Sequence, residues 1–326
     1  MIAAHPSSLT FRVILGMGIL AGVLDAKAQS VNSLRIVSAG TAGSPSDVIS
    51  RIVATQLADS QNWRINVENR PGALATLAIA DVLKQPADGR TIMTIDVPVV
   101  AAPALAPERH LRLETDFAPV IQLSKDYSVL VVSPSVQAKS LAELIAVLKS
   151  QPGKFNFSSG PFGTPSHLIG EMFKLQAGVA ATHVPYPGPQ QRLIDLMGGI
   201  TQFEFMAASN AVDLIAAGRL RAIAVTAPRR VMGLKDVPTV VEQGFPELVV
   251  EGWEGFAVKT GTPNDMIARL NAAVNSTLAT EKVRRAFANL GAEPVGGTAA
   301  EFGAFVSSQI AHWGSVVRES GTKMPR

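Results

Sequence analysis

The stretch LRIVSAGTAGSPSDVISRIVATQLAD, from Leu34 to Asp59, decides the fold. It predicts a strand over Leu34 to Val37, a loop of small residues from Ser38 to Pro45, and an amphipathic helix that opens near Asp47. Ser44 and Asp47 have the spacing of a capping box. A loop so poor in side chains leaves backbone N–H groups bare, and the helix N-terminus adds a partial positive charge. The stretch is therefore a candidate seat for an anion, and the alternative is an ordinary strand-to-helix turn.

A second stretch, from Phe155 to Arg192, repeats this arrangement. It predicts a short strand over Phe155 to Phe157, a small polar loop from Ser158 to Pro165, and a helix that Ser166 or Thr164 caps. Two such loops, far apart in the chain, predict two domains that each aim a helix N-terminus at a shared cleft.

The composition excludes several classes of protein. The 326 residues are 47% hydrophobic and 17% charged, which is enough for two α/β lobes with real cores. The formal charge is only +3 and the lysines and arginines are scattered, so the sequence shows no basic patch that would bind a nucleic acid. The absence of cysteine excludes thiol catalysis, cysteine-bound zinc and iron–sulfur clusters. The five histidines show no metal-ligand spacing, so we expect no metal and no cofactor.

Residues 1–28 read as a secretory signal peptide. Arg12 supplies the positive charge, Val13 to Leu24 form an apolar core too short to span a bilayer, and Ala26-Lys27-Ala28 is a cleavage site. We therefore expect an exported chain that begins near Gln29. Without cysteine it has no lipid anchor, and its stability must come from its core rather than from disulfides.

Strand-like and helix-like segments alternate along the rest of the chain, which predicts α/β layers with largely parallel sheets. The chain enters a second lobe after Leu123 and returns to the first near Trp253. The expected lobes are residues 29–123 plus 255–326 and residues 124–254. Other expected elements are a helix from Gly72 to about Lys84, separate strands over Ile121 to Leu123 and Val129 to Val132, and two final helices, Met266 to Leu278 and Ala300 to Val317.

A series of short segments gives the chain a family likeness: Asn69-Arg70-Pro71-Gly72-Ala73, Asp88-Gly89, Asp116-Phe117-Ala118-Pro119-Val120, Lys139-Ser140-Leu141-Ala142-Glu143-Leu144, Pro152-Gly153-Lys154, His183-Val184-Pro185-Tyr186, Asp195-Leu196-Met197-Gly198-Gly199, Leu220-Arg221-Ala222-Ile223-Ala224-Val225-Thr226, Asp236-Val237-Pro238-Thr239 and Leu290-Gly291-Ala292-Glu293-Pro294. Each segment is weak alone, but their common order is specific. Over almost all of its mature length the chain resembles the solute-binding receptors of tripartite tricarboxylate transporters, the Bug-type periplasmic binding proteins.

This resemblance implies an α/β fold of two lobes, a type II or Venus-flytrap periplasmic binding protein with a ligand cleft between the lobes. It implies a periplasmic receptor that closes by a hinge motion on a small carboxylate and delivers it to the membrane subunits of a tripartite system. We expect a monomer that binds no nucleic acid.

The resemblance also implies the ligand site. Two small-residue loops would hold the ligand carboxylate, partly through ordered waters. The matching positions in the first loop are Ala39, Gly40, Thr41, Gly43 and Ser46. Those in the second loop are Ser158, Ser159, Gly160, Thr164, Ser166 and His167.

The chain departs from the family pattern at three places. The first loop, which commonly has prolines and paired glycines, here reads Ala39-Gly40-Thr41-Ala42-Gly43-Ser44. Asp96 stands where relatives have a small hydroxyl residue, and Ala207-Ala208 stands where many carry an aspartate that faces the ligand. A carboxylate is thus lost from one wall of the cleft and gained on the other. This puts the usual amino-acid and dicarboxylate ligands in doubt.

Several side chains admit two interpretations. His167 is a ligand donor or a solvent-facing residue of the helix cap, and the helix N-terminus keeps it neutral. Asp47 begins a helix or contacts the ligand, and Asp96 contacts the ligand or pairs with Arg90 or Lys125. The Tyr186 ring stacks on the ligand or packs at the lobe edge. Trp253 is a packing residue near the hinge rather than a ligand platform.

His183 lies in a strand between apolar neighbours, which favours a structural role. The chain has no G-x-S-x-G, H-E-x-x-H or Walker motif, and adjacent Ser166 and His167 do not face each other on a helix. We therefore expect a receptor rather than an enzyme. Three alternatives remain: a signalling receptor for the same ligand class, an exported hydrolase with a noncontiguous triad, and the effector domain of a cytoplasmic regulator, against which the export signal argues.

Overall fold

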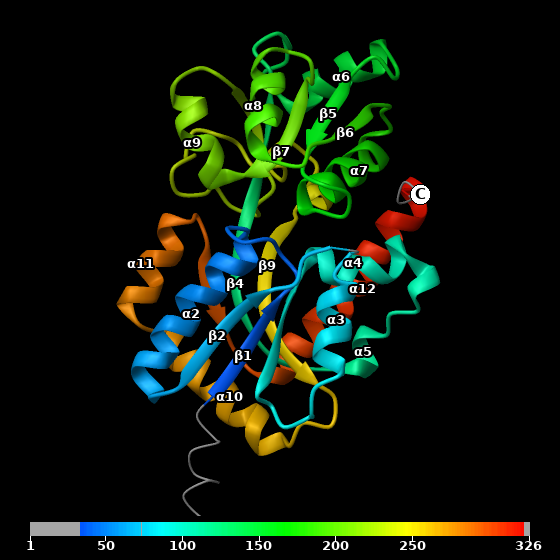
Figure 1. Ribbon diagram of the computed structural model, residues 1–326. Coiled ribbons are helices and arrows are strands. Elements are labelled where there is room, and N and C mark those ends of the chain that lie inside the picture. Colours follow the sequence, from blue (N-terminus) through cyan, green and yellow to red (C-terminus); the bar gives the residue numbers. More distant parts are fainter. Residues whose placement is uncertain (1–32, 73, 323–326) are drawn as a thin grey trace, which may run out of the picture.

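The computed structural model describes residues 33–72 and 74–322. The expected signal peptide lies outside these residues. Figure 1 shows the described chain as two lobes, one above the other, joined by two long strands. The expected α/β fold of two lobes is therefore confirmed.

The sheet of the lower lobe in Figure 1 takes strands from both ends of the chain. Its members are β1 (Ser33–Ser38), β2 (Arg64–Asn69), β3 (Thr91–Asp96), part of β4 (Phe117–Val132), β9 (Glu251–Lys259) and β10 (Glu293–Gly296). The strand order is β2-β1-β3-β9-β4, and β10 also pairs with β4. β1 is parallel to β2 and β3, whereas β9 is antiparallel to β3 and β4.

The sheet of the upper lobe is shorter. It contains the far end of β4 with β5 (Asn156–Ser159), β6 (Thr182–Pro185), β7 (Phe203–Ala207) and β8 (Arg221–Val225). β5 is parallel to β6 and to β7. The loops that follow these three strands therefore leave the same edge of the sheet, where open α/β sheets place their ligands.

Helices cover both sheets. They are α2 (Pro45–Gln61), α3 (Thr76–Leu83), α4 (Val97–Leu105), α5 (Leu113–Asp116), α6 (Leu141–Ser150), α7 (Pro165–Ala177), α8 (Pro189–Met197), α9 (Ala208–Ala216), α10 (Asn264–Leu278), α11 (Glu281–Asn289) and α12 (Ala299–Ser320), with 3-10 turns η2 (Pro107–Arg109) and η3 (Pro246–Leu248). Among the described residues, no helix has the length and apolarity that crossing a bilayer needs.

Strand β4 corrects one expectation. Two separate strands were expected, but a single strand of 16 residues runs through both lobes. Its residues 117–127 pair with β9, and its residues 128–132 pair with β7. The polar run Ser124 to Asp126 interrupts the hydrophobic pattern between the two expected strands. Backbone pairing does not depend on that pattern, so the strand continues through it.

The C-terminal part and α3 correct two more expectations. Three helices, not two, end the chain, because α11 lies between the expected pair. Helix α11 is short and buries only Val283 and Phe287, so its apolar signal is weak. Helix α3 begins at Thr76 rather than at Gly72, because Gly72, Leu74 and Ala75 all have positive φ. A right-handed helix cannot include such residues.

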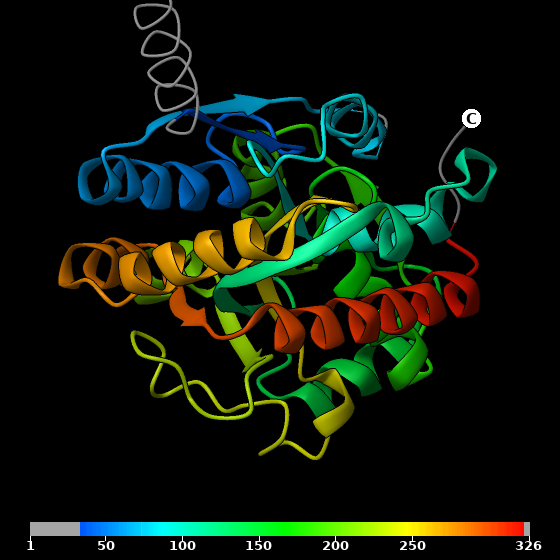
Figure 2. The ribbon, with the colours of Figure 1, turned by 90° about the horizontal axis from the view of Figure 1, so that it is seen from below.

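The hydrophobic core lies on both faces of the lower sheet. Figure 2 shows β4 passing between α10 and α12. Trp253 of β9 is 1% exposed and packs edge-on against Phe302 and Phe305 of α12. Its place in the core agrees with the packing role expected for it.

Candidate functional site

The first loop joins β1 to α2, and its polar groups bond to one another. The Ser46 Oγ lies 3.3 Å from both the Ser38 Oγ and the Ser44 Oγ. The Gly40 amide donates to the Ser38 hydroxyl over 3.2 Å. A Cβ on Gly40 would lie 2.2 Å from the Ser44 Oγ and 2.5 Å from the Ser46 Oγ, so a larger residue here would displace both hydroxyls.

The second loop, between β5 and α7, repeats the first position by position: SAGTAGSPSD at 38–47 matches SSGPFGTPSH at 158–167. The Ser166 Oγ accepts from the Gly160 amide over 3.1 Å and lies 3.3 Å from the Thr164 Oγ1. The cap residues Ser44 and Thr164 have nearly equal backbone angles, φ −69° and ψ 159° against φ −70° and ψ 156°. The two loops could therefore have been aligned residue by residue from the sequence, which predicted only that they share the order strand, loop and helix.

The repeat extends to the glycine before each cap. Gly43 and Gly163 have φ of 82° and 81°. The Gly43 amide donates to the Asp47 Oδ2 over 2.9 Å, and the Gly163 amide donates to the His167 Nδ1 over 3.1 Å. Each loop thus presents a helix N-terminus and a pair of hydroxyls, an arrangement suited to an anion.

The expected capping box is wrong in detail. Ser44 is the N-cap of α2, but its side chain bonds no α2 amide, and Asp47 reaches back to the amide of Gly43 instead. Asp47 also accepts from Arg51 and Asn69, over 2.8 and 2.9 Å. Burial alone would raise the Asp47 pKa, but these hydrogen bonds and the Arg51 charge outweigh it and lower the pKa. The carboxylate is therefore ionised, and its hydrogen bonds go to protein groups.

His167 is 1% exposed, so it does not face solvent as one interpretation had it. Its ring stacks on that of His183 with centroids 4.1 Å apart. Burial, and then the charge of Lys174, lowers the pKa of His167 to about 4. The expected neutral state is therefore found, but burial is the main cause rather than the helix N-terminus. Because its Nδ1 accepts from Gly163, its Nε2 carries the proton.

His183 and Ser159 form the contact nearest to a catalytic pair. The Ser159 Oγ lies 2.6 Å from the His183 Nε2 and donates its proton to the Gly160 carbonyl over 2.7 Å. His183 is then the donor to Ser159, and its buried Nδ1 has no partner in the described part of the chain. A general base would instead accept the Ser159 proton at Nε2, and its Nδ1 would donate to a carboxylate. The geometry therefore favours a structural pair over a nucleophile and base.

Asp96 ends β3 and caps α4, where its Oδ1 accepts from the Val99 amide over 3.1 Å. Its carboxylate also accepts from the Ser46 hydroxyl of the first loop, so it lies beside that loop. Burial raises the pKa of Asp96 to about 6, and the hydrogen bonds from Val99 and Ser46 only partly oppose this rise. The expected pairing partner Arg90 instead lies 3.7 Å from the carboxylate of Asp88.

Two further carboxylates lie on β9 and β4, the strands that join the lobes, and form a row with Asp96. Glu254 of β9 stands in register with Asp96 and with Ser124, whose hydroxyl donates to it. Asp126 of β4 lies against the Cα of Gly252. Burial first, then the charges of Asp126 and Asp96, raises the pKa of Glu254 to about 8. This row was missed, because antiparallel register between such distant strands leaves no local signal.

Tyr186 and Ala207 stand at the ends of β6 and β7. Tyr186 is 8% exposed, and its hydroxyl donates to the Asp195 Oδ2 over 2.6 Å, so its ring packs within the lobe. Ala207 is the N-cap residue of α9 and is only partly buried. Both lie at the sheet edge that also carries the second loop.

Arg192 of α8 is a cation at this edge that the sequence reasoning missed. Its Nε lies 3.1 Å from the Oε1 of Glu204 on β7, whose side chain is fully buried. The Ser158 hydroxyl donates to the other Glu204 oxygen over 2.8 Å. A Cβ on Gly160 would lie 3.6 Å from the Arg192 Nη1, so the guanidinium reaches the second loop.

The two lobes touch where α12 packs against α7, and also at two glycines. A Cβ on Gly163 would lie 2.9 Å from the Leu105 Cδ1 and 3.2 Å from the Leu74 Cδ2. A Cβ on Gly291 would lie 2.8 Å from the Ser209 Cβ. The second loop therefore rests on α4, and the start of α9 rests on the turn after α11. These contacts bring the lobes together beside the second loop.

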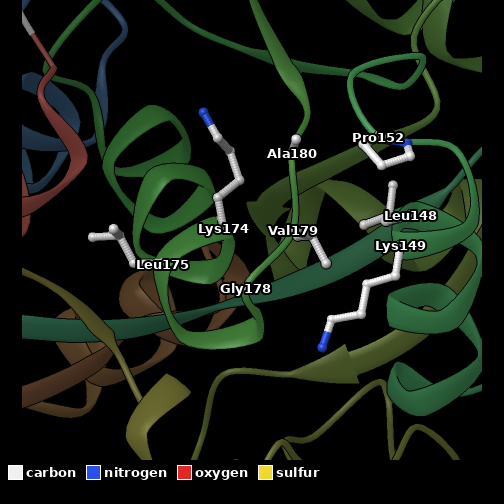
Figure 3. A pocket seen from close by; sticks show the side chains of 8 residues that line it. All are labelled: Leu148, Lys149, Pro152, Lys174, Leu175, Gly178, Val179 and Ala180. Atoms are coloured by element: carbon white, nitrogen blue, oxygen red, sulfur yellow. The ribbon is translucent and has the colours of Figure 1, made fainter.

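Two surface hollows lie away from these loops. One hollow, of about 460 Å³, lies between α6 and α7. Figure 3 shows that the side chains of Lys149 and Lys174 point away from each other there. Lys174 is held by both oxygens of Glu171, over 2.9 and 2.8 Å. No residue of either loop lines this hollow, so it is not the anion seat.

The repeat allows a matched test in the two loops. We expect Ser46→Ala and Ser166→Ala each to weaken ligand binding by about 0.5–1.5 kcal/mol, and by up to about 3 kcal/mol where the lost partner is charged. If one ligand bridges both loops, the two losses should not add in the double variant. Calorimetry measures all three, with the exposed Ser276→Ala of α10 as control. Unchanged affinity in both single variants would place the ligand elsewhere.

Comparisons with known proteins show the family of the chain. The family model of the tripartite tricarboxylate transporter family receptor matches residues 49–322. Protein BugT of Bordetella pertussis is 33% identical over 284 residues, which cover 86% of this chain and 87% of that protein.

Solved structures give the same result. An R. palustris protein with adipate has a TM-score of 0.79 at 29% identity and covers 90% of this chain and 99% of its own. MatC from Rhodopseudomonas palustris with bound malate has a TM-score of 0.76 at 29% identity, covering 88% of this chain and 99% of its own. The likeness suggested by the short segments is thus confirmed, and the chain belongs to the family of tripartite tricarboxylate transporter receptors, the Bug-type periplasmic solute-binding proteins.

Proposed function

We propose that this chain is a periplasmic receptor that captures a small organic acid by lobe closure and delivers it to the membrane subunits of a tripartite transporter. The repeated loop carries this proposal. Two helix N-termini with the same small-residue geometry, one in each lobe, can each hold an anionic group of a ligand bound between the lobes. Such a pair of donors suits a carboxylate and leaves room for bridging water.

The proposed contacts with the ligand come from both lobes. They are Ala39, Gly40, Thr41, Gly43, Ser46, Asp96, Ser158, Ser159, Gly160, Thr164, Ser166, His167, Tyr186 and Ala207. The proposed lobes are residues 29–123 plus 255–326 and residues 124–254, with the hinge in β4 and β9.

The proposed ligand carries one carboxylate and a donor group at its other end. The relatives solved with adipate and malate support the class of small carboxylic acids. Asp96 adds an acidic group beside the first loop, which disfavours a second ligand carboxylate there. An amide, hydroxyl or ammonium group would instead donate to Asp96.

A thermal-shift screen tests the proposal. The panel contains mono-, di- and tricarboxylates, aromatic acids, and the amides of the same acids. A bound acid at about 100 times its dissociation constant should stabilise the protein by roughly 2.7 kcal/mol, without turnover. The amides measure what the carboxylate contributes. A panel in which no acid raises the melting temperature would count against an organic-acid receptor.

The same ligand class is compatible with an extracytoplasmic signalling receptor. Transport and sensing both use the closed, ligand-bound form, so the partner separates them. We expect the loaded protein, as a monomer without a cofactor, to co-purify with membrane transport subunits. Co-purification with a membrane sensor instead would favour signalling.

A further inference from the structure

The guanidinium of Arg192 is only partly used by the protein. Its Nε meets the Glu204 Oε1 at 3.1 Å without hydrogen-bond alignment, and both atoms are buried with no hydrogen-bond partner among the described residues. Neither Nη atom donates to a protein atom in the part of the chain that the structure describes. The side chain remains 17% exposed. Arg192 therefore retains free donors of the kind that grip a carboxylate with two parallel bonds.

These free donors lie at the anion seat of the upper lobe. The Arg192 Nη1 approaches the Cα of Gly160, whose amide begins the second loop. β5 and β6 are parallel, so α7 and α8 both start at the same edge of the sheet. A carboxylate at the N-terminus of α7 would meet this guanidinium. The loop geometry alone does not require a cation there, so Arg192 is an independent feature.

Glu204 is the counter-ion of Arg192. β5 offers the Ser158 hydroxyl, which donates to it, and β4 places Val131 opposite it in register. The titratable groups nearby are Tyr186 at the end of β6 and Asp195 on α8, which bond to each other. Burial raises the pKa of Glu204 to about 7, and the charge of Arg192 and the Ser158 bond only partly oppose the rise. Near neutral pH the Glu204 carboxyl therefore exists in both states.

We propose that Arg192 binds the ligand carboxylate beside Gly160, and that Glu204 is the proton-accepting counter-ion whose charge sets the strength of that contact. This inference rests on the proposed function, because it assigns the anchor within the same site. When Glu204 is ionised, it neutralises Arg192. When Glu204 takes up a proton, the guanidinium faces the ligand with its full charge. Carboxylate binding and proton uptake at Glu204 therefore favour each other.

The sign and size of the coupling follow. If only the protonated form of Glu204 binds well, affinity scales with the protonated fraction, which falls about tenfold from pH 6 to pH 8 for a pKa near 7. Affinity for a monocarboxylate should rise as the pH falls. His167 and His183, with pKa values of about 4 and 3, do not titrate in this window. Asp96, Asp126 and Glu254 do, so the contribution of Glu204 is the difference between wild type and a variant at position 204.

The first experiment measures the anchor by calorimetry. The probes are lactate and benzoate, with lactamide and benzamide as uncharged counterparts. Arg192→Gln should weaken the acids roughly 10- to 100-fold, the loss of a charge-assisted bond, and leave the amides almost unchanged. Arg192→Lys keeps the charge without the two-pronged geometry and should fall between. Arg219→Gln, an exposed arginine of the same lobe, is the control for the lost charge.

The second experiment measures the counter-ion. Glu204→Gln keeps an acceptor for Ser158 but cannot ionise. Relative to wild type, its affinity for benzoate should lose about a tenfold pH dependence between pH 6 and 8. Calorimetry of wild type in buffers of different ionisation enthalpy should register proton uptake on binding at pH 7.5, and Glu204→Gln should lose this uptake. Melting temperatures of both proteins verify that the variant is folded.

The outcomes separate the two proposals. Acids that bind wild type but bind Arg192→Gln equally well would overturn the inference and leave the receptor function standing. The same holds if Glu204→Gln retains the full pH dependence of wild type. Wild-type protein that binds neither acid at any pH would count against the organic-acid receptor, and the inference would fall with it.

Discussion

Asp96→Asn is expected to improve the binding of short dicarboxylates such as malate by about two orders of magnitude at pH 7.5. The amide keeps the cap on Val99 and the contact with Ser46, so only the charge is removed. Two like charges about 5 Å apart repel by roughly 3 kcal/mol at an effective dielectric constant near 20. If Arg192 anchors one ligand carboxylate in the upper lobe, Asp96 excludes a second one from the lower lobe.

The pH dependence of this effect has a defined sign. Asp96 has a pKa of about 6 and is ionised at pH 7.5 but mostly neutral at pH 5. The advantage of Asp96→Asn over wild type for a dicarboxylate should therefore shrink as the pH falls through 6. Comparing both proteins at each pH cancels the titration of the ligand itself. Tight malate binding by wild type at pH 7.5, with no gain in the variant, would contradict exclusion by Asp96.

The same substitution should stabilise the unliganded protein. The folded-state pKa of Asp96 is raised from 3.8 to about 6, so the folded state holds its proton more tightly than the unfolded state. Stability is then lost as the pH rises from about 4 to about 6, and it stays lower above that range. Asp96→Asn removes this loss, roughly 2–3 kcal/mol at pH 7.5. Urea unfolding at pH 5 and 7.5 measures it, with the exposed Asp213→Asn of α9 as control.

Trp253→Ala should give the largest loss of stability, about 3–5 kcal/mol, because it empties a large buried site. The indole is 1% exposed, and its Nε1 donates to the Gln309 Oε1 over 3.2 Å. Trp313 donates to the same oxygen over 3.1 Å, so α12 is joined to β9 through one acceptor. The residue faces α12, whereas Glu254 beside it points to the other face of β9.

Denaturant unfolding measures this loss, and Trp253→Phe is the matched variant. Phenylalanine keeps a ring against Phe302 and Phe305 and should lose less than half as much stability. Ligand affinity of the folded Trp253→Ala protein should stay within a few-fold of wild type, because the indole does not reach the gap between the lobes. A large loss of affinity without a loss of stability would make Trp253 a ligand platform instead.

Local patterns predicted the parts of the fold that depend on local physics. The period of buried residues in α2 and α7 and the small residues before them located both loops, since capping and amphipathicity act within a few residues. The sequence did not predict that β4 is one continuous strand, because Ser124 to Asp126 are polar although their backbone still pairs. Helix α11 escaped because two buried residues form too short a pattern.

The charged part of the site depends on contacts between distant elements. Arg192 and Glu204 meet across α8 and β7, and neither residue type predicts the other from its own neighbours. Asp96 and Glu254 become neighbours only through the register of β3 and β9. Register is set by tertiary packing, and in β4 it shifts at two irregular positions, so it cannot be counted from the sequence.

The ribosome makes the strands of the lower sheet in an order that differs from their order in the sheet. β9 lies between β3 and β4, yet it is made after the whole upper lobe. Until residues 251–259 have left the ribosome, the facing edges of β3 and β4 have no partner, and unpaired strand edges invite aggregation. The lower lobe therefore cannot complete its sheet during translation. Its folding waits for nearly the full chain, which favours a nascent protein that is kept unfolded by chaperones until its synthesis ends.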